Sequence, residues 1–129
     1  RFLEVMARAL EINLENFGAI SLQSQKPAQI SSLCTVFAES EVISLIAKGV
    51  TQRDIVAGIH ESIGARIAAL AERAGIVTPV MFTGGVAKNI GMVKALEKAL
   101  GVPVEISAYA QFTGAIGGAV LAEKLSDEA

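Results

Sequence analysis

The sequence predicts an α/β fold in which helices cover a thin, mainly parallel sheet. Apolar residues recur at helical spacing over most of the chain, and two predicted short strands, a continuous apolar run at 79–83 and a second stretch at 102–107, interrupt that pattern. Because helices alternate with these runs, we expect the strands to pair in parallel through crossover connections. The apolar fraction of 52% comes mostly from Ala, Ile, Val and Leu, which suits helices packed on a sheet.

The first part of the chain is expected to be helical up to residue 14, because its apolar residues have helical spacing. Three residues that commonly end helices follow: Asn13, Asn16 and Gly18. A polar surface connection is expected at 21–29. Residues 28–33 are a candidate for a short strand.

Two further helices have a signal at both ends. One is expected at 35–48, and Gly49 closes it. The other begins at a pair that resembles a capping box, Thr51 and Asp54, and continues to Gly75. This second helix is the longest in the chain, so we expect it to form a structural spine.

The last part of the chain alternates strands and helices. The strand at 79–83 is expected to be buried on both faces, since it is continuously apolar. A helix at 88–100, a strand at 102–107 and a final helix at 110–125 follow. The final helix contains glycines, each of which costs up to ~1 kcal/mol of helix propensity. Tight packing on the sheet is expected to offset that cost, and the close approach of a ligand is the alternative.

Composition excludes several classes of protein. The 129 residues suffice for one domain with a core and are too few for two. A net charge of −2 with interspersed signs gives no basic stripe for a nucleic acid. No apolar run approaches the ~18 residues that span a membrane. The single cysteine indicates a reducing compartment, so a cytoplasmic location is expected.

The beginning of the sequence predicts that residues 1–129 are one piece of a longer protein. The chain opens on Arg1 where a natural start would have Met, and a helical pattern begins at once. The charged region, apolar stretch and cleavage site of a signal peptide are not found there.

Gly84 and Gly85 stand between a predicted strand and a predicted helix. Glycine at such a point lets the backbone approach a ligand closely or adopt a positive φ, and the start of a helix offers N–H groups. Ligands of α/β proteins also bind at the carboxyl ends of strands. The residues alone leave two interpretations open, a ligand-binding turn and a tight turn without a ligand.

Cys34 lies at the start of a predicted helix. The positive end of the helix dipole favours the thiolate, which is the form that binds metals or attacks electrophiles. The alternative is a small, buried apolar residue. An iron–sulfur cluster needs four thiolates, so one cysteine makes a site only if others come from elsewhere.

The remaining ionisable residues suggest no catalytic centre, and no catalytic residue is assigned. Glu39 and Glu41 are interpreted as acids in the first turn of a helix, where they complement its dipole. His60 has no metal ligand at suitable spacing and is interpreted as an ordinary helix residue. Asp54 in a helix cap and Asp127 in the tail are the only aspartates, so an aspartate that holds Mg²⁺ for phosphoryl transfer is not expected.

Four stretches point to a family when they are taken together and in order. They are CTVFAESEVIS at 34–44, IVAGIH at 55–60, TGGVA-x-N at 83–89 and AQ-x-x-GA-x-G at 110–117. They resemble the activator ATPases of 2-hydroxyacyl-CoA dehydratases, to which ATPase subunits of benzoyl-CoA reductases are related. The resemblance covers essentially the whole chain, and the Cys34 stretch is its most specific part.

This resemblance implies the C-terminal lobe of a two-lobed, actin-like (ribonuclease H-like) ATPase. Two copies of such an activator form a homodimer around one four-iron, four-sulfur cluster. They use ATP hydrolysis to pass a low-potential electron from ferredoxin or flavodoxin to the dehydratase. By this resemblance Cys34 is the second cluster ligand of each subunit, and Gly84, Gly85 and Asn89 belong to the turn at the adenosine part of ATP or ADP.

The same resemblance implies parts that this chain lacks. In the family, the first cluster cysteine and the phosphate-binding hairpins of the other lobe lie upstream of the stretch that matches Arg1. We therefore expect that this chain alone neither hydrolyses ATP nor holds a stable cluster, since two copies would provide only two thiolates.

Two other readings of the chain remain. One is a lobe of another actin-like protein, such as a sugar kinase, in which Cys34 is structural. The other is a non-catalytic dimerisation or docking module with Cys34 at a subunit contact.

Overall fold

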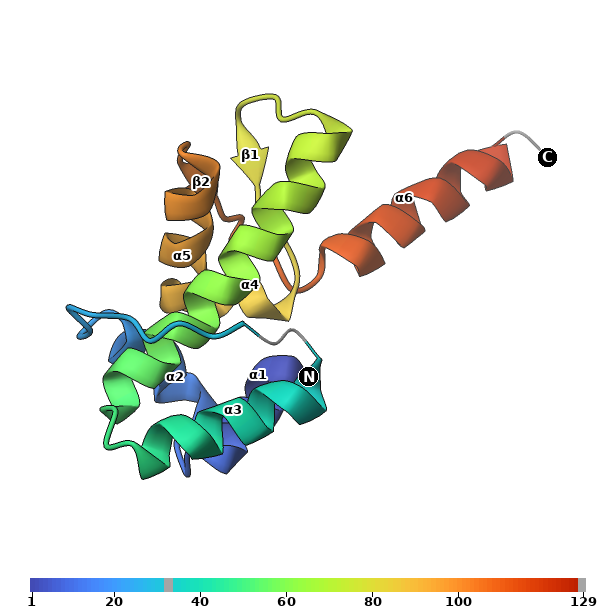
Figure 1. The fold of residues 1–129 in the computed structure, drawn as a ribbon. Coiled ribbons are helices and arrows are strands. Elements are labelled where there is room, and N and C mark those ends of the chain that lie inside the picture. The colour runs from blue at the N-terminus through green and yellow to red at the C-terminus, as the bar shows by residue number, and fades with distance from the viewer. Residues whose placement is uncertain (32–33, 128–129) are drawn as a thin grey trace.

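A computed structural model describes residues 1–31 and 34–127 of the chain. Figure 1 shows one long central helix with shorter helices and a small sheet beside it, and a last helix that extends away from them. The elements in chain order are α1 (Phe2–Ala9), α2 (Leu14–Ser21), α3 (Thr35–Ala47), α4 (Gln52–Ala74), β1 (Val80–Met81), the single 3₁₀ turn η1 (Gly85–Lys88), α5 (Ile90–Leu100), β2 (Val104–Glu105) and α6 (Thr113–Asp127).

Helix α4 is the spine that the sequence predicts, and its two ends are those the caps indicate. The Thr51 hydroxyl accepts a hydrogen bond from the Asp54 amide at its start, and Gly75 ends it with a φ of +83°. Helices α2 and α5 both pack on α4. The helix predicted at 35–48 is confirmed as α3, with Lys48 as its C-cap.

Two glycines allow close packing along α4. A Cβ at Gly58 would lie 2.0 Å from the carbonyl oxygen of Ala28, and a Cβ at Gly64 would lie 2.8 Å from that of Ala95. Any side chain at either position would therefore overlap backbone atoms of the neighbouring segment. The apolar core lies beside the first part of α4, where α1, α2 and α3 meet this helix around the fully buried side chains of Met6, Phe17 and Ile55.

The prediction of a single helix up to residue 14 is wrong. Helix α1 ends at Ala9, the backbone turns at Glu11 with a φ of +55°, and the Asn13 side chain then caps a second helix by accepting from the Glu15 amide. The break lets both short helices place an apolar face in the core. Asn13 is thus a start signal rather than a stop, and Gly18 lies inside α2.

The sheet is parallel, as predicted, but smaller than predicted. Val80 of β1 pairs with Val104 of β2. Residues 28–31 of the third expected strand form no strand, and residues 32–33 lie outside the described part of the chain. The prediction that β1 is buried on both faces is wrong, because a two-stranded sheet leaves Met81 58% exposed.

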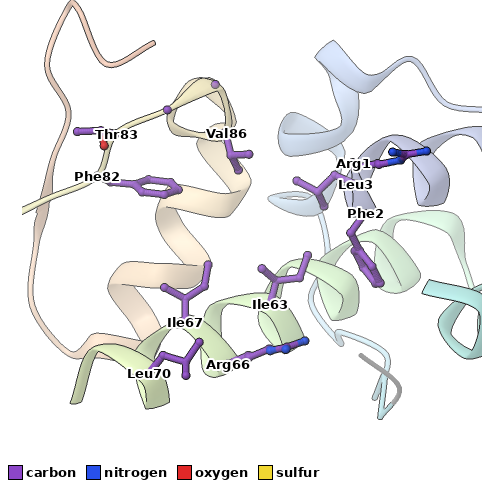
Figure 2. A pocket seen from close by; sticks show the side chains of 12 residues that line it. Arg1, Phe2, Leu3, Ile63, Arg66, Ile67, Leu70, Phe82, Thr83 and Val86 are labelled. Carbon is purple, nitrogen blue, oxygen red and sulfur yellow. The ribbon is translucent and has the colours of Figure 1, made fainter. Parts of the chain in front are cut away.

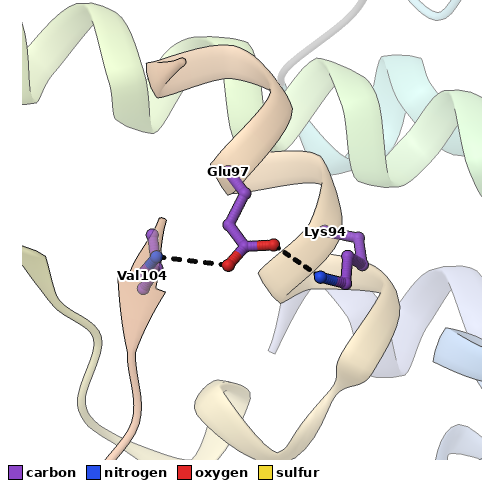
Figure 3. A network of polar contacts seen from close by, with 3 residues as sticks. All are labelled: Lys94, Glu97 and Val104. Atoms are coloured by element: carbon purple, nitrogen blue, oxygen red, sulfur yellow. Dashed lines mark hydrogen bonds and ion pairs between the residues drawn. The ribbon is translucent and has the colours of Figure 1, made fainter. Parts of the chain in front are cut away.

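A polar network joins α5 to the sheet (Figure 3). The Glu97 carboxylate accepts from the Lys94 ammonium at 2.7 Å and from the Val104 amide at 3.2 Å. The hydrogen bond from Lys94 and then that from Val104 lower the pKa of Glu97. This carboxylate therefore fixes the position of β2 relative to α5.

Helix α6 extends away from the rest of the molecule (Figure 1), and all of its residues are exposed. A Cβ at Gly114, Gly117 or Gly118 would have no neighbour within 4 Å. The expected tight packing of this helix on the sheet is therefore wrong, because nothing in the described chain covers it. None of the helices in the described ranges is long and apolar enough to cross a membrane.

Candidate functional site

The glycine turn predicted at 84–89 is a sharply defined structure between β1 and α5. Gly84 has a φ of +92°, a conformation that L side chains rarely adopt, and its amide donates to the carbonyl of Ala110 at 2.7 Å. The η1 turn follows, and α5 begins at Ile90 rather than at Lys88 as predicted. A Cβ at Gly84 would meet nothing within 4 Å, so the space beside this glycine is open.

An apolar cavity of about 490 Å³ lies on one side of the turn (Figure 2). Gly84 and Gly85 form part of its wall, and Ile63, Ile67 and Leu70 of α4 form another part. Figure 2 places Arg1, Phe2 and Leu3 on the far side of this space.

A second cavity, of about 510 Å³, borders the same turn and is more polar. It contains two of the three residues predicted to bind nucleotide, Gly85 and Asn89. Its other polar lining comes from Arg1 and from α1, α2, η1 and the segment before α6: Glu4, Glu15, Lys88 and Gln111. The cavity thus offers carboxylate, amide and ammonium groups around an exposed stretch of glycine backbone.

Asn89 has a structural role that the sequence analysis missed. Its side-chain oxygen accepts from the Met92 amide at 2.9 Å, which caps α5, and lies 3.1 Å from Nε2 of His60. Gly18 of α2 leaves room for this amide group, because a Cβ there would lie 2.4 Å from Oδ1 of Asn89. The end of the candidate turn is therefore held by three helices.

His60, interpreted from the sequence as an ordinary helix residue, lies inside α4 and is buried, only 1% exposed. Its Nδ1 lies 2.8 Å from the Val56 carbonyl, and its ring lies 5.3 Å from that of Phe17. Burial lowers the pKa of His60, although the hydrogen bonds to Val56 and Asn89 act in the opposite direction. A sequence signal existed, because His60 follows Val56 by four residues on the apolar side of α4.

Cys34 is the N-cap residue of α3, so its predicted place at a helix start is confirmed. The thiol is exposed and makes no capping hydrogen bond. The apolar side chains of Val36 and Phe37 beside it are also exposed. Within residues 1–31 and 34–127, no group of three or more His, Cys, Asp or Glu side chains could hold a metal ion.

The interpretation of Glu39 and Glu41 as first-turn acids is wrong, because α3 starts at Thr35 and has no acid in its first turn. Glu41 instead accepts from both the amide and the hydroxyl of Ser31, at 3.0–3.1 Å. This contact ties the segment that leads to Cys34 to the second turn of α3. Asp54 accepts from the Ser24 and Thr51 hydroxyls, each at 2.6 Å, and these two bonds lower its pKa.

Comparison with known proteins finds the same family over nearly the whole chain. Residues 1–122 match the BadF/BadG/BcrA/BcrD ATPase family. The chain is 51% identical to the (R)-2-hydroxyglutaryl-CoA dehydratase activating ATPase of Acidaminococcus fermentans over 96% of its length. It is 48% identical to the activator of lactoyl-CoA dehydratase of Anaerotignum propionicum and 35% identical to a benzoyl-CoA reductase component of Thauera aromatica, over 95% and 93% of its length. It covers 48%, 47% and 45% of these three proteins, about half of each.

A solved structure has the same fold. The activator of the 2-hydroxyisocaproyl-CoA dehydratase from Clostridium difficile, with bound ADPNP, superimposes with a TM-score of 0.91 at 43% identity and covers 99% of this chain and 48% of that one. This likeness confirms the α/β, actin-like ATPase fold class. The chain belongs to the BadF/BadG/BcrA/BcrD ATPase family.

Proposed function

We propose that this chain is the nucleotide-binding, C-terminal lobe of an ATPase that activates a 2-hydroxyacyl-CoA dehydratase. Three relatives that it matches over nearly its full length are named as activators of CoA dehydratases, and one of them is named an activating ATPase. The observation that carries the proposal is the glycine turn that follows a parallel strand: Gly85 lines the more polar cavity, and a Cβ there would meet only the Gln111 amide nitrogen, at 3.7 Å.

The more polar of the two cavities is the better seat for a nucleotide. A ribose needs partners for its hydroxyl groups, which carboxylates such as those of Glu4 and Glu15 can provide. A purine edge pairs well with amide side chains, and Gln111 lines the same cavity. Gly85 allows the backbone to lie against the ligand. Asn89 closes this seat at the end of the turn.

The phosphates and Mg²⁺ are assigned to the other lobe. The Asp54 carboxylate is occupied by Ser24 and Thr51 and lies in a helix cap away from the turn. Asp127 is the last residue of α6. Magnesium ions at such sites are held by carboxylates together with the nucleotide phosphates. We therefore expect hydrolysis only in the complete two-lobed protein.

Cys34 is proposed as one ligand of a four-iron, four-sulfur cluster that two copies of the complete protein share. Its exposed thiol fits a ligand at a subunit contact, because the thiol makes no hydrogen bond to the N-terminus of α3 that metal binding would break. The described chain provides one thiolate where a cluster needs four, so a second cysteine must come from the other lobe. When bound, the cluster would carry one electron from ferredoxin or flavodoxin to the dehydratase.

The proposal is tested by ATP-dependent activation of a 2-hydroxyacyl-CoA dehydratase in the absence of oxygen. The complete protein is compared with its Cys34→Ser variant and with Ser40→Ala, an exposed change on the same helix. We expect Cys34→Ser to lose activation together with its iron, and Ser40→Ala to keep both. Full activation by Cys34→Ser would contradict the role of the thiol, and ATP-dependent phosphorylation of a sugar would identify a kinase instead.

A further inference from the structure

His60 and Asn89 form a contact between the spine of the lobe and the end of the candidate nucleotide turn. Nε2 of His60 lies 3.1 Å from Oδ1 of Asn89, and the two residues are 29 positions apart in the chain. Oδ1 is identified as the oxygen because the Met92 amide donates to it. This contact requires an N–H at Nε2, while Nδ1 faces the Val56 carbonyl oxygen at 2.8 Å. A neutral ring with its N–H at Nε2 donates to Asn89 alone, and only the protonated ring donates to both oxygens.

The surroundings of this contact are tightly packed. Gly18 leaves space for the Asn89 amide, and a Cβ at Gly91 would lie 2.1 Å from the Ser21 hydroxyl. That hydroxyl donates to the Gly18 carbonyl at 2.6 Å. Helices α2, α4 and α5 thus meet at one side chain, and Asn89 cannot shift without moving a helix.

We propose that His60 is a positioning residue for the nucleotide turn. It holds the Asn89 side chain, Asn89 fixes the first turn of α5, and the Asn89 amide donates back to the Val86 carbonyl at 2.9 Å. The conformation of Gly84–Lys88 is therefore set from inside the lobe by a residue that does not line the nucleotide cavity. This inference rests on the proposed function, since it assigns His60 a role at the same site.

Two substitutions separate the hydrogen bond from the volume of the ring. His60→Gln places an amide N–H near the position of Nε2, whereas His60→Met is similar in length and has no donor. Ile59→Val, at a fully buried neighbour on α4, is the control for a small loss of core packing. His60→Asn, whose amide reaches only the position of Nδ1, replaces His60→Met if that variant does not fold.

The experiment measures two quantities on the complete protein: the Kd for ADP by calorimetry, and hydrogen exchange of the Ala87, Asn89 and Met92 amides. For His60→Met we expect a Kd about tenfold higher or more, and faster exchange at these amides, since the partly buried Oδ1 of Asn89 loses one of its two donors. His60→Gln and Ile59→Val are expected to stay within about threefold of the unsubstituted protein, because the donor is kept in one and untouched in the other.

The outcomes distinguish this inference from the proposed function. An unchanged Kd and unchanged exchange in folded His60→Met would overturn the positioning role while leaving nucleotide binding intact. Equal losses in His60→Gln and His60→Met would also overturn it, because packing rather than the hydrogen bond would then be responsible. If the unsubstituted protein does not bind ADP, the proposed function fails, and the exchange of the three amides still decides whether His60 holds the turn.

Discussion

Gly85 is the residue at which the proposed nucleotide seat can be tested with the smallest change. A Cβ there would meet only the Gln111 amide nitrogen, at 3.7 Å, so the fold tolerates alanine. The added methyl group enters the space that the nucleotide would occupy. We predict that Gly85→Ala raises the Kd for ADP about tenfold in the complete protein. Gly118→Ala, the same change on exposed α6, should leave the Kd unchanged, and equal effects of the two would contradict the seat.

His60 makes stability depend on pH in a defined window. Burial lowers its folded pKa below the ordinary 6.5, so the unfolded chain binds a proton more readily. The contribution of neutral, buried His60 to the free energy of unfolding is complete above pH 6.5. It is lost as the pH falls through 6.5 towards the folded pKa. Asp54 and Glu97, whose pKa values are also lowered, lose their contributions only below 3.8 and 4.5.

We therefore predict that urea unfolding at about pH 5.5 gives a smaller free energy than at about pH 7.5, and that His60→Gln removes most of the difference. The isolated chain is sufficient for this comparison, because it contains a single histidine. The same slope with and without His60 would contradict this assignment.

The helices contain two kinds of glycine, those packed against a neighbouring backbone and those that face open space. Gly58 faces a backbone carbonyl at a distance that no Cβ can occupy, whereas Gly117 of α6 faces open space. We predict that Gly58→Ala lowers the free energy of unfolding by about 1–3 kcal/mol, because the helix and the 28–30 segment must separate. Gly117→Ala should instead raise the helical content of α6, by a propensity gain of up to about 1 kcal/mol. Far-ultraviolet circular dichroism and urea unfolding measure both, and a stable Gly58→Ala would contradict the close approach.

Elements with local end signals could be predicted from the sequence, and those that depend on partners could not. Thr51 and Gly75 set the ends of α4, and Gly101, in the left-handed conformation, ends α5 where it was expected. The break after Ala9 escaped prediction because the helical pattern continues across it. It forms because two short helices bury more of their apolar residues than one straight helix would.

The turn was found from its glycines, but the contact that holds it was not. A pattern of residues along one chain shows where a strand meets a helix. It does not show that a histidine on another helix reaches Asn89, because that depends on how α4 packs against α5. For the same reason, β1 was expected to be buried on both faces and α6 to pack on the sheet, although Met81 of β1 is exposed and nothing in the described chain covers α6.

At the scale of the whole molecule, this chain supplies one half of the proposed ATPase. It spans about half the length of the curated relatives that it matches, and it contains the candidate nucleotide turn and one exposed cysteine. Helix α6 presents Ile116, Val120 and Leu121 to solvent, a bare apolar surface that suits burial against the other lobe. The proposed function places adenosine recognition in this lobe and the phosphate chemistry in the other.

The most direct test of this account is iron and sulfide analysis after anaerobic reconstitution, on the complete protein and on residues 1–129 alone. The account predicts about four irons per dimer of the complete protein, with loss of iron in Cys34→Ser, because each subunit then supplies two of four thiolates. For the isolated chain it predicts no stable cluster and no ATP hydrolysis. About four irons per dimer of the isolated chain, with the visible absorption of a cluster, would contradict it.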